Sequence, residues 1–257
     1  MTMPDALQIL GDNRVIGATL SGTSGSSTRE NLRDLKYDTV WESVGASDTK
    51  NEYTYVRFFD AAGNYTCYPF DRILLLNTNA LRIEITVPYG ATPPISMGID
   101  CGIYTNLSPD ILIPIPIGVD ESYMQGVDLM IKTTQTANEE KYIGELKLCK
   151  HILTLNALTQ FQRQDYALEG NFYTRSGALV RWREFRKFGG SLTMQNVTQA
   201  QRDALWAAYE LYDFFVFCFF SEYKLSETYD VAIVSPPTEV FNRKTQLYEI
   251  TLEVKER

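Results

Sequence analysis

Few side chains in this sequence are suited to catalysis. His151 is the only histidine, and it lies in an apolar segment with strand character. A Ser–His–Asp or Cys–His arrangement would have to use it, and no Gly-x-Ser-x-Gly motif accompanies it. We interpret His151 as a structural residue in or beside the core. A glycosidase-like pair of carboxylates stays open as an alternative, because the sequence does not select two of its 32 acidic residues.

An oxygen-rich turn is the best candidate for a metal site. Asp34, Asp38 and Thr39 supply the hard oxygen ligands that calcium prefers. The alternative is a solvated turn without metal. The sequence has no Cys-x-x-Cys pair and one histidine, which argues against zinc, and it has no glycine-rich phosphate loop. We therefore predict no cofactor, and keep a structural calcium in this turn as the alternative.

Two aromatic residues near the same turn are candidates for contact with a sugar. They are Tyr37 and Trp41. An exposed aromatic ring beside converging polar groups is typical of a binding site. For Trp41 we favour a core position and keep the sugar-contacting role as the alternative.

The strongest cationic patch lies at residues 181–187, where basic and aromatic residues alternate. Such a segment suits a solvated strand, a nucleic-acid surface or a protein interface, in which arginine and aromatic residues are enriched. We favour a subunit interface over recognition of nucleic acid. The predicted interface residues in this segment are Arg181, Trp182, Arg183, Phe185 and Arg186.

Composition limits the class of protein further. The chain has 257 residues, 44% of them hydrophobic, and a net charge of −8. Residues 1–144 hold 10 basic and 18 acidic residues, whereas the remainder holds 14 of each. An acidic half argues against phosphate backbones and anionic membranes. We expect the four widely spaced cysteines to be reduced thiols, and we identify no signal peptide and no apolar run long enough to span a bilayer.

Strand signals dominate the first half. Residues 81–87 alternate between apolar and polar types, and residues 111–117 alternate apolar residues with Pro114 and Pro116. Because proline donates no hydrogen bond to a sheet, this segment should be an edge strand or an extended arm. As an arm it would place Ile113 and Ile115 in a subunit interface. Further strands are predicted at residues 53–59, 65–68, 72–76 and 125–133.

The second half adds one helix to further strands. Thr198 and Gln201 form a capping box before an apolar stripe, which predicts a helix over residues 198–213. The phenylalanine-rich residues 214–220 predict a buried strand, and residues 229–234 and 247–255 a terminal pair. Residues 133–144 read as a linker or a long hairpin tip. We therefore predict two mainly β domains, at residues 1–140 and 141–257.

A recognisable pattern joins the acidic turn to a later segment. Its residues are Asn31, Leu32, Asp34, Asp38, Thr39 and Trp41, with residues 72–79. The pattern resembles discoidin-type, or galactose-binding-like, jelly-roll sandwiches. That resemblance implies a structural calcium in the equivalent loop, although Leu35 replaces the glycine that usually follows the first aspartate.

The second domain resembles the tail-tube-like domain of phage distal-tail and baseplate proteins. Residues 183–192, the capped helix, the phenylalanine-rich strand and residues 249–255 carry this resemblance. It implies a C-terminal antiparallel sandwich or barrel. Together the two resemblances imply a structural protein of a tailed-phage virion, assembled in the host cytoplasm, that forms a homo-oligomeric ring and contacts other tail proteins. The alternative is a carbohydrate-binding or adhesion module that recognises a surface glycan, and neither function is enzymatic.

Overall fold

The computed structural model describes residues 6–36, 39–89, 97–105, 109–115, 124–155, 160–164, 166–173, 179–221 and 224–257. They form mainly antiparallel strands, as predicted. The chain divides into two compact units. Asn13–His151 form the first, called the sandwich unit here, and Met1–Asp12 with Ile152–Arg257 form the second, the helix-bearing unit.

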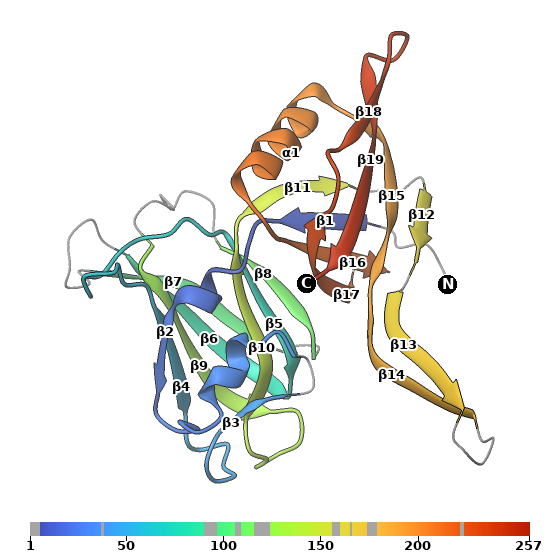
Figure 1. Cartoon of the computed structure of the whole chain (residues 1–257). Helices are drawn as coiled ribbons and strands as arrows, with labels where there is room; N and C mark the ends of the chain where they lie inside the picture. Colours follow the sequence, from blue (N-terminus) through green and yellow to red (C-terminus); the bar gives the residue numbers. More distant parts are fainter. Residues whose placement is uncertain are drawn as a thin grey trace. The chain divides into compact units, whose positions relative to one another are not determined.

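The sandwich unit is built from two sheets that share one core (Figure 1). The five-stranded sheet has the order β2-β4-β9-β6-β7: β2 (Thr19–Gly22), β4 (Glu52–Arg57), β9 (Gly126–Thr134), β6 (Ala80–Tyr89) and β7 (Met97–Thr105). The four-stranded sheet has the order β3-β10-β5-β8: β3 (Trp41–Glu42), β10 (Tyr142–Cys149), β5 (Arg72–Thr78) and β8 (Ile111–Pro114). Two 3-10 helices, η1 (Arg14–Gly17) and η2 (Arg29–Arg33), flank β2 in the chain.

Alternation along β6 shows how the sequence forms this core. Ile83, Ile85 and Val87 are fully buried between the sheets, while Glu84 and Thr86 are half-buried on the opposite face. Successive side chains of a strand point to opposite faces, so one face enters the core and the other is left for polar groups. The alternation predicted for residues 81–87 is confirmed from Ile83 onward.

The proline-containing strand β8 is an edge strand, as one of the two interpretations predicted. Pro114 lies opposite Arg72 of β5, at the edge of the four-stranded sheet. Ile113 and Ile115 are 1% and 7% exposed and belong to the sandwich core. Their assignment to a subunit interface was therefore wrong, because their apolar surface is already buried inside this unit.

The boundary between the units lies later than predicted. Strand β10 pairs with β5 from Ile143 to Cys149, so it completes the sandwich. Residues 133–144 thus connect two sandwich strands and are no interdomain linker. The first strand, β1 (Ala6–Leu10), pairs with β16 of the helix-bearing unit. The sandwich unit is consequently an insertion in the sequence of the other unit.

A buried ammonium group holds loops of the sandwich unit together. Lys141 is 1% exposed, and its Nζ donates to the carbonyl oxygens of Ser47 at 2.6 Å and Lys50 at 2.8 Å. Burial lowers the pKa of Lys141, although the carboxylates of Glu52 and Asp48 act in the opposite direction. Lys141 is therefore an internal cation that joins the β9–β10 connection to the segment before β4.

Glu52 is the buried carboxylate beside this cation. It accepts hydrogen bonds from Thr23 Oγ1 at 2.6 Å and Ser24 Oγ at 2.7 Å, and Lys50 Nζ lies 2.6 Å away. Burial alone would raise the pKa of Glu52, but these partners bring it below its ordinary value. Because the folded pKa is the lower one, Glu52 contributes stability that is present above its ordinary pKa and is lost as the pH falls through the folded value.

The helix-bearing unit contains an eight-stranded sheet of order β11-β1-β16-β17-β19-β15-β12, with β18 paired to β19 (Figure 1). Its further strands are β11 (His151–Leu155), β12 (Gln160–Arg163), β15 (Gly189–Val197), β16 (Phe215–Ser221), β17 (Lys224–Ile233), β18 (Thr238–Asn242) and β19 (Leu247–Glu256). Strands β13 (Tyr166–Tyr173) and β14 (Leu179–Lys187) pair with each other in a separate ribbon.

The helix and the phenylalanine-rich strand form as predicted. Helix α1 (Gln199–Leu211) has the Thr198–Gln201 capping box and buries Leu205 and Ala208. Strand β16 buries its residues from Phe215 to Phe219. The predicted terminal pair is more elaborate, because β19 forms a hairpin with the unpredicted β18 and meets β17 only from Val231 to Ile233. Within the described residues, no helix is long and apolar enough to cross a membrane.

Candidate functional site

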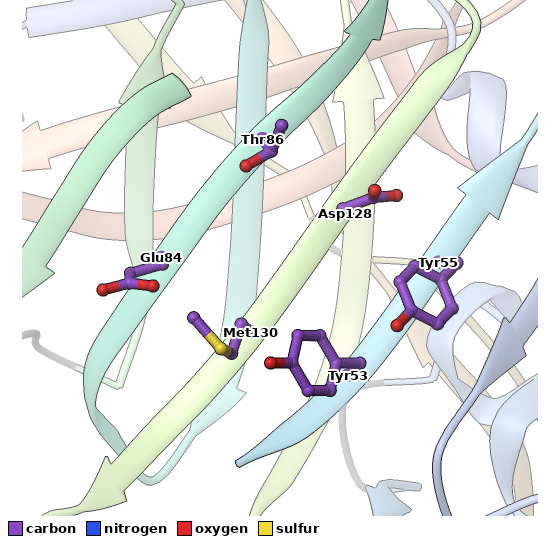
Figure 2. A pocket seen from close by; sticks show the side chains of 6 residues that line it. All are labelled: Tyr53, Tyr55, Glu84, Thr86, Asp128 and Met130. Carbon is purple, nitrogen blue, oxygen red and sulfur yellow. The ribbon is translucent and has the colours of Figure 1, made fainter. Parts of the chain in front are cut away.

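A hollow of about 250 Å³ lies on the outer face of the five-stranded sheet of the sandwich unit. Three adjacent strands contribute two residues each, in two rows that cross the sheet (Figure 2). The register places Tyr55, Asp128 and Thr86 in one row and Tyr53, Met130 and Glu84 in the other. We call these six residues the sheet hollow.

Two tyrosine rings form one side of the sheet hollow. Tyr53 and Tyr55 are two residues apart on β4, so they share the outer face. Their ring centroids are 6.0 Å apart and their planes differ by 15°. Both side chains are half-buried, and Figure 2 shows both rings nearly face on in a view onto the sheet. An aromatic ring with a hydroxyl edge can contact an apolar ligand surface and also form a hydrogen bond.

Two carboxylates lie on the other two strands, Asp128 on β9 and Glu84 on β6, and each has a cationic partner. Arg57 Nη1 pairs with Asp128 Oδ1, and Lys132 Nζ pairs with Glu84 Oε1. The Arg57 guanidinium also lies 5.6 Å from the centroid of the Tyr55 ring. Arg82 Nη2 also lies 3.8 Å from Glu84 Oε1, so both carboxylates are compensated and the sheet hollow carries acceptor oxygens without an excess negative charge.

The Tyr55 hydroxyl keeps its proton because of its surroundings. Burial and, secondarily, the nearby Asp128 carboxylate raise the pKa of Tyr55 above its ordinary value. The phenol therefore keeps its proton at neutral pH and remains a donor. A carboxylate has two oxygens and about four acceptor positions, so the cationic partners of Asp128 and Glu84 still leave room for ligand hydroxyls. The hollow thus offers an apolar surface, a donor and several acceptors.

The structure gives the predicted calcium turn an internal hydrogen-bond network. Asp34 Oδ2 accepts from Thr39 Oγ1 at 2.6 Å, and Asp34 Oδ1 accepts from the Lys36 N–H at 3.0 Å. Leu35 has a φ of 60°, the left-handed conformation that glycine adopts easily. Asp38 lies outside the described residues. Among the described residues, no group of three or more histidine, cysteine or acidic side chains is placed to hold a metal ion.

Trp41 is a core residue. It is 0% exposed, and its Nε1 donates to the Ser24 carbonyl oxygen at 3.3 Å. A fully buried ring offers no surface to a sugar, so Trp41 is removed from the candidate sugar-contacting residues. Tyr37, the other candidate, lies outside the described residues.

The predicted interface residues of the cationic segment all lie on β14. The backbone places this strand in the β13–β14 ribbon, where Arg181 pairs with Asn171 and Arg183 with Glu169. A register shift between Leu168 and Glu169 interrupts the pairing of the two strands. The only histidine, His151, is half-buried and outside the sheet hollow, and burial together with nearby Arg72 lowers its pKa.

The sheet hollow was not predicted from the sequence, although all three of its strands were. The signal was the alternation in residues 53–57, 82–86 and 128–132, which gives each strand an outward face with polar or aromatic residues. The pairing order of the strands, which brings those faces together, is a tertiary property that no single segment encodes.

Comparisons with known proteins give fold likenesses only. No protein-family model and no curated protein matches the chain. A Ruminococcus gnavus GH29 fucosidase in complex with fucose matches at 12% identity and a TM-score of 0.41, over 55% of this chain and 27% of the fucosidase. This chain thus spans about a quarter of that enzyme.

Two smaller matches are single modules. A Clostridium perfringens CBM32 module has 14% identity and a TM-score of 0.40, over 54% of this chain and 99% of the module. An F5/8 type C domain from Bacteroides fragilis has 11% identity and a TM-score of 0.40, over 56% of this chain and 98% of the domain. These modules are discoidin-like β-sandwiches. Structural similarity at such TM-scores gives no information about the ligand or activity of this chain. None of these three proteins is a phage tail protein.

Proposed function

We propose that this chain is a carbohydrate-binding protein whose sandwich unit recognises a neutral surface glycan in the sheet hollow. The observation that carries this proposal is the pair of half-buried tyrosine rings that share one sheet face with two carboxylates. A pyranose has an apolar C–H face and a rim of hydroxyl groups. The rings suit that face, and the carboxylate oxygens suit the hydroxyls.

The charges of the hollow favour a neutral ligand over a cationic one. Aromatic rings with nearby acids also bind quaternary ammonium groups. Here Asp128 and Glu84 already have Arg57 and Lys132 as partners. A cationic ligand would have to displace an internal cation, whereas a sugar only needs further acceptor positions. The pairing of both carboxylates with cations also favours binding without hydrolysis of the glycan. Glycoside hydrolysis requires one carboxyl group that donates a proton, and a neighbouring cation keeps a carboxyl group ionised.

Replacing Tyr55 with alanine is expected to weaken glycan binding by at least about tenfold, or about 1.4 kcal/mol. The substitution removes one of the two aromatic rings and one hydroxyl donor of the sheet hollow. We would measure it on an array of neutral and acidic glycans with the full-length chain, followed by calorimetric titration of the best neutral ligand.

Tyr68→Ala serves as the matched control for this substitution. Tyr68 is a 39% exposed tyrosine of the same unit outside the sheet hollow. Its replacement should leave binding unchanged. An array without any bound glycan, or equal binding by wild type and Tyr55→Ala, would refute the proposed function.

The β13–β14 ribbon favours a second function, which is self-assembly. Its two strands pair only with each other among the described strands, and an isolated two-stranded ribbon is marginally stable in water. The sequence of residues 166–187 holds five basic and two acidic residues, whereas residues 1–144 are acidic. We propose that the ribbon docks on another copy of this chain, in a ring within the tail of a tailed-phage virion.

Replacing residues 166–187 with a short glycine turn is expected to abolish self-association while the eight-stranded sheet stays folded. Sedimentation velocity at several protein concentrations would measure it, with Lys244→Ala in the exposed β18–β19 turn as control. A wild-type chain that stays monomeric at every concentration would contradict the assembly proposal. Absence of the chain from purified virions would contradict its placement in a phage tail.

A further inference from the structure

The two tyrosine rings of the sheet hollow form a surface and leave no slot between them. Their centroids are 6.0 Å apart and their planes differ by 15°. A group inserted between two parallel rings needs a contact of about 3.5 Å on each side, or about 7 Å in all. The rings are too close for that, and both face the viewer in Figure 2. A ligand therefore lies on top of them.

Hydrogen-bonding groups repeat along the same direction as the rings. In one row Tyr55 lies opposite Asp128, which in turn lies opposite Thr86. In the other row Tyr53 lies opposite Met130, which lies opposite Glu84. Each row thus contains one aromatic ring and one carboxylate. This is the same pair of functional groups twice, one step apart along β4.

The rows differ in polarity. Asp128 is directly beside Tyr55, whereas the thioether of Met130 separates Tyr53 from Glu84. Beyond Glu84, the exposed Ile103 of β7 extends this second row with another apolar side chain. The Tyr55 row is therefore suited to a sugar unit with more hydroxyl contacts, and the Tyr53 row to one that presents more C–H surface.

We propose that the sheet hollow binds two successive pyranose units of a neutral oligosaccharide laid along β4, one over each tyrosine. This inference rests on the proposed carbohydrate-binding function. A glycan chain is the ligand class that repeats a ring and its hydroxyl groups at regular steps. The site therefore selects internal or terminal disaccharide segments over free monosaccharides.

The test is a length series with the full-length chain. Isothermal titration would compare each neutral monosaccharide of the array, namely glucose, galactose, mannose, fucose and N-acetylglucosamine, with array glycans of two, three and four units that contain it. Affinity is expected to rise at least about thirtyfold from one unit to two and by less than about threefold beyond two. The best disaccharide should lose at least about tenfold with either Tyr53→Ala or Tyr55→Ala.

Phenylalanine variants separate stacking from hydrogen bonding. Tyr53→Phe keeps the ring and should bind within about threefold of wild type, because its row depends on apolar contact. Tyr55→Phe should lose more, since it removes the hydroxyl donor of the more polar row. A monosaccharide that binds as tightly as its disaccharide, with both losing affinity in Tyr55→Ala, would overturn the two-unit inference and leave the proposed function standing. If no glycan of any length binds, the proposed function itself fails.

Discussion

Replacing Lys141 with methionine is expected to destabilise the sandwich unit by about 3–5 kcal/mol, the usual cost of removing one partner from a buried charged network. Methionine keeps most of the side-chain length but donates no hydrogen bond. The carbonyl oxygens of Ser47 and Lys50 would lose their partner, and Glu52 would lose a nearby cation. Few single substitutions in this unit should cost more.

Hydrogen exchange at increasing urea concentration would measure this loss on peptides from β4 and β9, which report on the sandwich unit alone. Lys36→Met is the matched control, because Lys36 is an exposed lysine of the same unit. Surface substitutions of this kind usually stay within about 0.5 kcal/mol. A Lys141→Met variant as stable as the control would show that the buried ammonium is not needed to hold the loops.

Replacing Gly126 with alanine is expected to prevent β9 from pairing with β4, at a cost of more than about 4 kcal/mol. Gly126 has a φ of 146°, and an added Cβ would lie 1.8 Å from the Val56 carbonyl oxygen. That atom belongs to the neighbouring strand, so only a shift of β9 would relieve the contact. Asp128 would move with it, and glycan binding should be lost together with stability.

Gly63→Ala separates the effect of backbone conformation from that of the clash. Gly63 also has a positive φ, 81°, but an added Cβ there would meet no atom within 4 Å. We expect it to cost only about 1 kcal/mol, the ordinary penalty for a left-handed alanine. Thermal unfolding of both variants would settle the comparison. Equal melting temperatures for the two would mean that β9 can move without loss.

Local patterns were sufficient to predict individual elements of this chain. The alternation at Ile83, Ile85 and Val87 identified an inward face, and the Thr198–Gln201 capping box located the helix start. Both signals act within a few residues, where backbone geometry and side-chain type are directly coupled.

Predictions that depended on tertiary neighbours were less successful. Ile113 and Ile115 were assigned to an interface because prolines interrupt their strand, but the partner that buries them is β5 and the sandwich core. Lys141 lies in a polar segment interpreted as a linker or a long hairpin tip, and only the folded loops show that its charge is internal. Strand β1 pairs with β16 of the helix-bearing unit, and no pattern within residues 6–10 indicates this distant partner.

For the candidate site, too, local patterns predicted the strands but not which residues lie next to one another. Tyr53 and Tyr55 were within a predicted strand, yet nothing in residues 53–59 indicates that Asp128 and Glu84 will lie beside them. Trp41 was a plausible sugar-contacting residue from its type alone, and its burial excludes that role. Residue type thus suggested candidates for a binding site, but strand order determines which side chains lie together on the sheet face.

The insertion of the sandwich unit between β1 and the rest of its sheet has a consequence for biosynthesis. Leu10 pairs with Val216, so the first strand leaves the ribosome long before its partner is translated. Domains generally fold as units during synthesis, and the sandwich unit is complete by His151. The nascent chain should therefore carry a folded sandwich unit before β16, the partner of β1, has been translated.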